Sequence, residues 1–595
     1  MSFTGNTATP VHVMKTEKNS PTMIHRNLTA ELAVVGGGLA GVCAAIAAAR
    51  HGVKTVLIQD RPVLGGNASS EIRMGIVGAH GDENKETGIL EELQLENIRR
   101  NPLMRYTRWD DILYSAVIRE PNLKLLLNTS VRKTETSGKR IVAVEAWNGN
   151  EYCEYRISAD FFADCSGDGI LRLSGAEFRI GRELPGEFDE DYLNEGGDAR
   201  TMGNSILLQL RKTEEDRPFL APEWAYHFTD ADFAEGEGSA PGHHSYKHPW
   251  PEDNNFWWIE FGGNLDTIGD ANAIQFELKR IAYGVWEYMK NHPDGRCRNY
   301  ELDWIGSLPG KRESCRFVGD HILTQHDIMA GGRFDDVVCY GGWTLDDHHP
   351  DAFFHRGYAS THHTPPSPFG IPFRCLYSRN IENLLFAGRN ISCTHMGMSA
   401  TRVMGTCALM GQVIGTAAGI LKRCGITPRL LYQQHIGELQ ELLLEDDVML
   451  PGHRRKIPAL TLEAVASHEI LRAGIDRGKE AAQLAVGQPC EYRWKTPRII
   501  SSLRIVFDTD LAERNKRMLK LEAESVWKEM PQMMPEKFRV EAEIDGNWQT
   551  LLQERENLLR LYRKTFPPCR ATAVRLIVEQ TYGGRDARIF SFEVG

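Results

Sequence analysis

Three closely spaced glycines near the N-terminus constrain the fold of this chain more than any other feature. Gly36, Gly38 and Gly41 have the spacing G-x-G-x-x-G and open an Ala-rich segment without helix breakers. Short apolar runs at residues 32–35 and 55–58 flank this segment. The order strand, glycine turn, helix, strand is typical of a dinucleotide-binding unit, because the turn and the helix start bring free N–H groups to a pyrophosphate. The sequence therefore predicts an α/β, Rossmann-like domain.

A second glycine pair supports this prediction. A Gly-Gly-Asn segment, residues 65–67, follows shortly after the second predicted strand. In this respect the chain resembles FAD-binding flavoproteins with two dinucleotide-binding domains. Gln59 stands where such folds usually carry a ribose-binding carboxylate, and Asp60 is next to it. An amide binds a ribose hydroxyl more weakly than a carboxylate does. We predict that one of the two binds the ribose and leave the choice open.

The bulk composition is that of a globular protein with several domains. The 595 residues exceed what one hydrophobic core holds, so we expect about two to four domains. The net charge of −11 argues against a nucleic-acid or membrane partner. The 12 cysteines include no C-x-x-C pair and no zinc or iron–sulfur spacing. This pattern fits a reduced, cytoplasmic protein without a disulfide framework.

Two stretches of the chain have to be distinguished from a targeting signal and from a membrane span. Residues 1–27 are polar and lack the apolar core of a signal peptide, so we expect a loose tail. Residues 403–421 carry no charge and are long enough to span a bilayer. Because Thr, Gln, Gly and Ala make up much of this stretch, we expect a helix buried inside a soluble protein and packed closely through its small residues.

Two separate stretches, residues 28–181 and 365–450, are assigned to the FAD-binding domain. In the first, ADFFADCSGDG at residues 159–169 reads as a strand that ends in a glycine turn. In the second, NLLFAGRN at residues 383–390 reads as another strand that runs into a glycine. After it we expect a helix start near Ser399. The positive end of that helix, under the flavin, would stabilise the reduced ring.

The intervening residues, 182–364, are rich in Trp, His and charged residues and predict an inserted α+β substrate domain. Its expected elements are strands at 204–210 and 256–261, a helix at 274–289, a charged turn at 309–314 and the polar group WTLDDHH at 343–349. Adjacent residues of an extended chain point to opposite sides, so at most one of His348 and His349 should face a given site. We therefore predict no metal site.

At this point a family resemblance is specific. The segments VVGGGLAG, GGNASSE, FADCSGDG, PGKRES, WTLDDHH, IPFRCLY and NLLFAGRNISCTHMGMSATRVMG occur in order across roughly residues 31–422. In these the chain resembles the FAD-dependent oxidoreductase family of the glutathione-reductase superfamily, which is related to fumarate reductases. The resemblance implies non-covalent FAD along residues 36–67, with its ring near Ser399. It also implies a substrate between the FAD-binding core and the inserted domain.

Motif position and resemblance together give two sets of candidate site residues. The predicted cofactor-binding residues are Gly36, Gly38, Gly41, Gln59, Asp60, Arg61, Gly65, Gly66, Asn67, Ser69, Arg73, Val131, Ser166, Gly167, Asp168, Gly388, Arg389, Met398 and Ser399. The predicted catalytic residues are His348, His395, Arg374, Arg312 and Asp346. We expect one of the histidines to act as a base and one of the arginines to hold a carboxylate or stabilise an oxyanion.

The last part of the chain, residues 451–595, has a different pattern. Phe538, Val540, Ala542 and Ile544 alternate with charged residues, which is the pattern of a half-buried strand. Several such short runs predict an all-β sandwich, and their arrangement resembles the discoidin or galactose-binding-like jelly roll. Such a module either binds a glycan or only buttresses a domain, because fold alone does not determine function.

The predicted function is FAD-dependent hydride transfer between flavin N5 and a CH–OH group of a polar small molecule, namely a sugar, uronate or polyol. One alternative is reduction of an activated C=C bond in a carboxylate substrate. An alternative of another class is a non-catalytic glycan-binding or scaffold protein. We expect an external electron acceptor of unknown identity, and the oligomeric state stays open.

Overall fold

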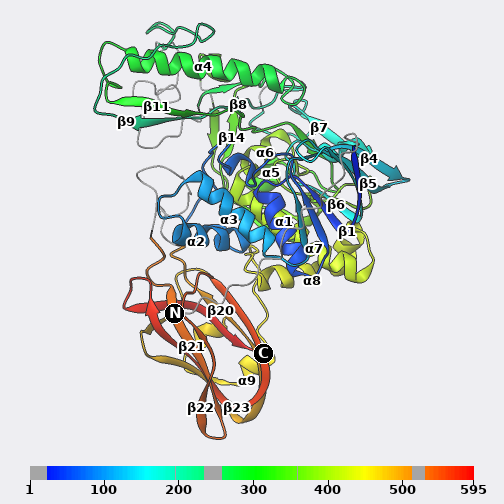
Figure 1. Ribbon diagram of the computed structural model, residues 1–595. Helices are drawn as coiled ribbons and strands as arrows, with labels where there is room; N and C mark the ends of the chain where they lie inside the picture. The colour runs from blue at the N-terminus through cyan, green and yellow to red at the C-terminus, as the bar shows by residue number, and fades with distance from the viewer. Residues whose placement is uncertain (1–22, 194–195, 234–257, 358–359, 512–528) are drawn as a thin grey trace, which may run out of the picture.

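The computed structural model describes residues 23–193, 196–233, 258–357, 360–511 and 529–595. Figure 1 shows three layers: a cap built around helix α4 (Ala271–Asn291), a central α/β body and a β-sandwich at the opposite end. The predicted helix at 274–289 is therefore present and slightly longer. The predicted strand at 256–261 is described only from residue 258, and its strand β10 spans Glu260–Phe261.

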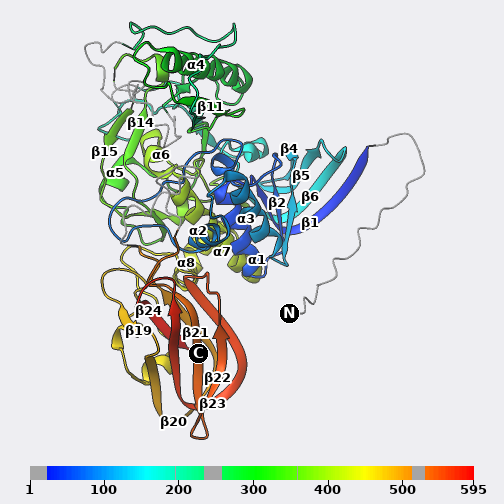
Figure 2. The ribbon, with the colours of Figure 1, turned by 60° about the vertical axis from the view of Figure 1, so that its left-hand side comes forward.

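The central body is organised on a seven-stranded sheet. Its strand order is β3-β2-β1-β6-β5-β4, and β17 also pairs with β6. The bounds are β1 Ile24–Val35, β2 Thr55–Ile58, β3 Leu123–Leu126, β4 Thr129–Ser137, β5 Arg140–Asn148, β6 Cys153–Asp164 and β17 Leu384–Phe386. Strands β1, β2, β3, β6 and β17 pair in parallel, whereas β4 and β5 form an antiparallel arm that Figure 2 shows at the side of the body. The predicted Rossmann-like fold is confirmed.

The first strand begins earlier than expected. Residues 24–27, which the sequence assigned to a loose tail, are the start of β1 and pair with residues 153–156 of β6. Their polar side chains give no strand pattern in the sequence. Hydrogen bonds of their backbone to the neighbouring strand hold these residues in the sheet, and burial of their side chains does not. Residues 1–22 of the expected tail lie outside the described residues.

Two helices pack against each other on this sheet with their backbones almost in contact. They are α1 (Leu39–Arg50) and α7 (Met404–Cys424). A Cβ atom added at Gly411 would lie 2.0 Å from the carbonyl oxygen of Ala40, and one at Gly415 would lie 2.2 Å from that of Ala44. Helix α7 is long and apolar enough to cross a membrane, but 89% of its most apolar window is buried inside the protein. The small residues therefore serve close packing, as predicted.

The central body contains further helices. Two of them are α2 (Ile89–Arg100) and α3 (Tyr106–Ile118). The others are α5 Gln325–Met329, α6 His395–Thr401, α8 Pro428–Glu445 and α9 Ala459–Glu463.

Among the described residues, the short strands of the inserted segment and of its borders form two-stranded antiparallel pairs. The pairs are β8 (Asn204–Ser205) with β10, β9 (Leu208–Lys212) with β11 (Tyr300–Ile305), β7 (Phe178–Ile180) with β12 (Cys315–Phe317), β13 (Val337–Gly341) with β16 (Phe369–Pro372), and β14 (Leu345–His348) with β15 (Ser360–His363). The strand expected at 204–210 is thus two strands. The cap has its own hydrophobic cluster around α4, which includes Ile206, Ile259, Ile281 and Trp286 and is separate from the main core.

The C-terminal part is an antiparallel seven-stranded sheet with the order β19-β24-β20-β23-β21-β22 and β18 paired to β20. The bounds are β18 Val465–Ala466, β19 Ala482–Ala485, β20 Pro489–Phe507, β21 Pro535–Ile544, β22 Asn547–Glu554, β23 Leu561–Thr581 and β24 Asp586–Val594. Phe538, Val540 and Ala542 are each 0% exposed, which confirms the predicted alternation in β21. This sheet forms the sandwich at the bottom of Figures 1 and 2.

Arginines of the sandwich attach it firmly to the central body. Arg477 donates to the carbonyl oxygens of Glu83 and Lys85 at 2.7 and 3.3 Å and to Oγ1 of Thr87 at 3.0 Å. Arg560 pairs with Asp447 at 2.8 Å just after the end of α8. These contacts satisfy backbone oxygens and a carboxylate that would otherwise be poorly solvated at the boundary.

Arg477→Ala should therefore lower the free energy of unfolding by about 2 kcal/mol, because several acceptors lose their donor at once. Urea denaturation followed by tryptophan fluorescence measures this change. Arg493→Ala is the matched control, since Arg493 is an exposed sandwich residue paired with Glu491 and Glu543 and should contribute within about 0.5 kcal/mol. Equal effects of the two variants would contradict the attachment by Arg477.

Candidate active site

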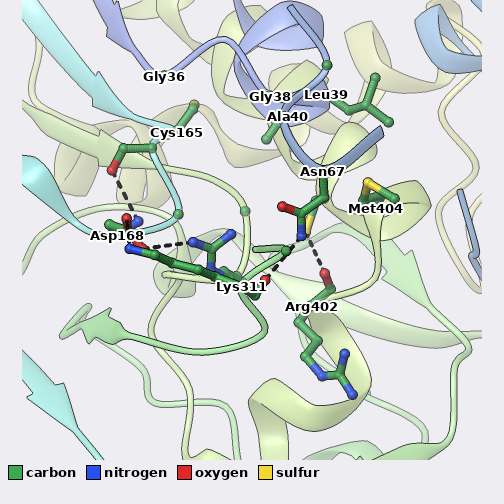
Figure 3. A pocket seen from close by; sticks show the side chains of 18 of the residues that line it. Gly36, Gly38, Leu39, Ala40, Asn67, Cys165, Asp168, Lys311, Arg402 and Met404 are labelled. Atoms are coloured by element: carbon green, nitrogen blue, oxygen red, sulfur yellow. Dashed lines mark hydrogen bonds and ion pairs between the residues drawn. The ribbon is translucent and has the colours of Figure 1, made fainter. Parts of the chain in front are cut away.

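A cavity of about 520 Å³ lies between the carboxyl ends of the body strands and the short strands of the insertion. Ligands of open α/β sheets usually bind at that edge. Fourteen predicted cofactor residues line it: Gly36, Gly38, Gln59, Asp60, Arg61, Gly65, Gly66, Asn67, Val131, Ser166, Gly167, Asp168, Gly388 and Arg389. Figure 3 shows the glycine turn on one side of this cavity, with Asp168, Lys311 and Arg402 across from it.

The three fingerprint glycines have different surroundings. A Cβ atom at Gly41 would lie 1.8 Å from the carbonyl oxygen of Gly36, so this glycine serves the packing of α1 and does not line the cavity. Gly36 has φ +103° and passes close to Cys165. A Cβ atom at Gly38 would meet nothing within 4 Å. Gly38 therefore leaves an open backbone cradle at the N-terminus of α1, where N–H groups favour an anion.

The two candidate ribose ligands, Gln59 and Asp60, differ in their bonding. Oε1 of Gln59 accepts from the N–H of Gly37 at 2.7 Å, and its Nε2 donates to the carbonyl oxygen of Val63 at 3.0 Å. The Gln59 amide thus braces the glycine turn. Asp60 also lines the cavity and is exposed, so the geometry favours Asp60 as the ribose acceptor.

A half-buried carboxylate lies among cations on the opposite wall. Asp168 pairs with Lys311 at 2.8 Å and with Arg389 at 2.8 Å, and it accepts from Oγ of Ser314 at 3.0 Å. Burial alone would raise the pKa of Asp168, but Arg389 and Lys311 outweigh it and lower the pKa to about 2. Lys311 also accepts, through its carbonyl oxygen, from Nδ2 of Asn67 at 3.1 Å. The charged turn of the insertion therefore closes the cavity against the second glycine pair.

Several predicted residues do not line the cavity. These are Gly41, Ser69, Arg73, Met398, Ser399, Arg374 and His395. The Arg73 guanidinium lies over the Trp304 ring at 4.3 Å. Arg374 is held by Asp336, with contacts of 2.8 and 3.0 Å. Both arginines thus bind other parts of the protein.

The helix expected to start near Ser399 begins elsewhere. Helix α6 starts at His395, because the side chain of Thr394 caps it by accepting from the N–H of Gly397 at 2.9 Å. Ser399 is buried within that short helix. Helix α6 ends at Thr401, and α7 starts at Met404 with Val403 as its N-cap. Val403 and Met404 line the cavity, so the N-terminus of α7 replaces the predicted one.

The side chains of strand β14 point alternately to two different sites. Asp346 and His348 line the cavity, whereas Asp347 lies on the other face and contacts Nε2 of His395 at 2.8 Å. His349 does not line the cavity, in agreement with the expectation that only one of the two adjacent histidines faces a given site.

The two histidines proposed as bases are each held between two carboxylates. His348 has Nδ1 3.0 Å from Glu260 and Nε2 3.2 Å from Asp346. His395 has Nδ1 3.0 Å from Glu313 and Nε2 2.8 Å from Asp347. Burial alone would lower their pKa values.

The carboxylates reverse that effect. The pKa of His348 is raised above its usual range, and that of His395 rises to about 10. Because both ring nitrogens of each histidine contact carboxylates, this geometry argues against either as a base.

Asp346 is the centre of the polar group at the insertion side of the cavity. Its carboxylate contacts Arg402 at 3.1 Å, Nε1 of Trp343 at 3.4 Å and Nδ1 of His362 at 3.3 Å, besides His348. Burial would raise the pKa of Asp346, but His348, Arg402 and His362 hold it far below its usual range. Asp346 therefore stays ionised and fixes the groups around it.

His362 lines the cavity, although the sequence analysis did not single it out. It lies on β15 opposite Asp346 in the hairpin register, lines the cavity, and its side chain is 54% exposed. Its Nδ1 lies 3.3 Å from Oδ1 of Asp346, and its Nε2 lies 3.1 Å from Oγ of Ser360. The only sequence signal was a second pair of adjacent histidines, His362 and His363, near the end of the insertion.

The comparison with known families fits this geometry. The profile of the family described as "FAD dependent oxidoreductase" matches residues 31–443, well over half of the chain. The chain belongs to this family. Its FAD-dependent oxidoreductase part and its sandwich match different solved structures.

Over the larger part, the chain is similar to a geranylgeranyl bacteriochlorophyll reductase-like protein of Thermoplasma acidophilum. The identity is 11%, the match covers 71% of this chain and 85% of that chain, and the TM-score is 0.32. The quinol fumarate reductase FrdA of E. coli matches at 12% identity over 71% and 78% of the chains, with a TM-score of 0.29. A family 32 carbohydrate-binding module of Streptococcus pneumoniae EndoD matches at 16% identity over 24% of this chain and 97% of that one, with a TM-score of 0.18.

The residues of this FAD-dependent oxidoreductase fit the family's cofactor. The open cradle at Gly38, the starts of α1 and α7 and the exposed Asp60 line one continuous cavity. Within it, Gly36–Gly38 would hold the pyrophosphate and Asp60 the ribose. The buried Nε of Arg389 has no hydrogen-bond partner among the described residues, which leaves a donor for a bound anion.

Proposed function

We propose that this FAD-dependent oxidoreductase oxidises a CH–OH group of a polar small molecule, namely a sugar, uronate or polyol. The observation that carries the proposal is the Asp346–His362 pair, which lies in the same cavity as the cofactor cradle. When bound, FAD supplies an acceptor for the hydride from the substrate carbon. A side chain of the protein must then accept the proton of the substrate hydroxyl.

His362 is suited to take that proton. Nδ1 of His362 lies 3.3 Å from the Asp346 carboxylate, so a proton on Nδ1 would be favoured there, and Nε2 would accept the proton of the substrate hydroxyl in place of its contact with Ser360. After the transfer, the carboxylate of Asp346 stabilises the imidazolium. His348 and Arg402, on other sides of Asp346, keep this carboxylate ionised and in place.

The surrounding wall is suited to a substrate with several hydroxyl groups. Trp343 offers a flat ring beside His80, with centroids 4.4 Å apart, and such rings pack against apolar sugar faces. Lys311, Arg312 and Arg402 line the same region and supply hydrogen-bond donors, whereas Asp346 supplies acceptors. An apolar substrate would make no use of these donors and acceptors and would hinder their solvation.

The test is anaerobic reduction of the bound flavin by a panel of sugars, uronates and polyols. We expect bleaching by at least one of them, slowed about 10²-fold or more in His362→Gln and partly rescued by added imidazole. His363→Gln is the matched control, because His363 is the next residue but stacks on Tyr192, with ring centroids 3.6 Å apart. The proposal fails if no compound bleaches the flavin, or if both variants behave alike.

Reduction of an activated C=C bond is the second candidate. Its support is Arg402, whose buried Nε has no hydrogen-bond partner among the described residues and which lines the cavity, so it could give a proton to an adjacent carbon. Enoates supplied with a reduced dye distinguish the two reactions. Turnover of enoates without flavin bleaching by alcohols would favour this second candidate.

Glycan binding by the sandwich stays a prediction. The same holds for the use of an external electron acceptor. Affinity electrophoresis of the full chain in gels containing soluble polysaccharides tests the glycan directly. Retarded migration in one of these gels would support the prediction.

A further inference from the structure

Three side chains capable of binding a metal ion meet just beyond the active-site strand β14. They are His349, Asp351 and His355, and one ligand atom from each lies within 4.8 Å of the others. Nδ1 of His349 is 3.7 Å from Oδ2 of Asp351. The group lies outside the cavity lining and is partly exposed, so an ion from solvent can reach it.

The arrangement around these residues resembles the support of a ligand set. Asn264 donates from Nδ2 to Oδ1 of Asp351, which orients the carboxylate and leaves Oδ2 toward His349. Such secondary hydrogen bonds are common around metal ligands.

We propose that His349, Asp351 and His355 bind one divalent transition-metal ion, such as zinc. Two imidazoles and one carboxylate favour such an ion over Ca²⁺ or Mg²⁺, which prefer all-oxygen sites. The two rings are stacked, with centroids 3.5 Å apart and planes at 15°. Parallel rings cannot both direct a lone pair at one ion, so one imidazole rotates about its Cβ–Cγ bond on binding, and a water molecule completes the tetrahedron.

The site would join two turns that matter for the active site. Asn264 follows β10, which carries Glu260, and Asp351 follows β14, which carries His348. An ion held there would fasten the ends of these strands together and keep Glu260 beside His348. Its role is therefore structural, and it does not depend on which substrate the cavity accepts.

Equilibrium dialysis of the holoenzyme against Zn²⁺, with metal measured by atomic absorption, tests the proposal. We expect one zinc per chain in the wild type, about 100-fold weaker binding in the double variant His349→Gln/His355→Gln, and about 10-fold weaker binding in Asn264→Ala. The control is His326→Gln/His435→Gln, which removes two partly exposed histidines elsewhere. Visible circular dichroism of the flavin confirms that each variant is folded.

Two results would overturn the proposal. One is absence of stoichiometric zinc on the wild type. The other is equal zinc binding by the wild type and by both the double variant and Asn264→Ala. Because the readout is bound metal, a failure here is separate from a failure of the alcohol-oxidation proposal.

Discussion

Asp346→Asn should lower kcat for substrate oxidation about 10³-fold while FAD stays bound. The amide cannot serve as an anion for His348, His362 and Arg402 together, all of which contact the carboxylate in the wild type. It can also hold His362 in the wrong tautomer, with the proton on Nε2. Single-turnover reduction of the flavin, followed by stopped-flow absorbance, measures the effect.

Asp347→Asn separates this effect from a general loss of charge. Asp347 is the next residue on β14 but points to His395, away from the cavity. We expect its reduction rate to stay within about tenfold of the wild type, although its stability falls because His395 loses a charged partner. If Asp347→Asn slowed reduction as much as Asp346→Asn, the Asp346–His362 pair would not be the proton acceptor.

Gly38→Thr should abolish stable FAD binding without unfolding the chain, a loss of affinity of at least about 10²-fold. The added side chain has open space, because a Cβ at Gly38 meets no protein atom within 4 Å. Thr is also a good N-cap residue for α1. The Thr side chain therefore occupies only the space in which the pyrophosphate would bind. The yield of yellow protein and the Kd of added FAD, from flavin fluorescence quenching, measure the loss.

Gly437→Thr provides the control for this variant. Gly437 lies on α8, away from the cavity, and a Cβ there also meets nothing within 4 Å. This variant should keep its FAD. Normal FAD affinity in Gly38→Thr would falsify the placement of the cofactor against the glycine turn.

The sequence was sufficient for the parts of the fold that local patterns specify. The glycine spacing predicted the turn before α1, because a Cβ atom at Gly36 or Gly41 would collide with backbone atoms, whereas Gly38 leaves open space for a ligand. The uncharged stretch of α7 predicted close packing for the same reason. The alternation in β21 predicted the sandwich, since one side of that strand is buried.

The active site depended on contacts between distant segments, which local patterns do not contain. The pairing of His362 with Asp346 arises from the β14–β15 hairpin, and the carboxylate of Glu260 reaches His348 from another strand. The sequence offered His348 and His395 as bases, whereas in the structure each lies between two carboxylates that raise its pKa. Likewise, the N-terminus that faces the cavity depends on the break between α6 and α7, where no proline marks it.

The separate hydrophobic cluster of the cap has a consequence for how substrate enters. Because α1 and α7 touch through their backbones and the sandwich is fastened by arginines, the body and the sandwich have little freedom to part. The apolar side chains of the cap pack among themselves, so a tilt of the cap would break polar contacts such as that of Arg73 with Trp304 but would not expose the main core. Substrate entry and product release would then depend on a tilting motion of the cap relative to the body. The rate of that motion would set an upper limit on turnover.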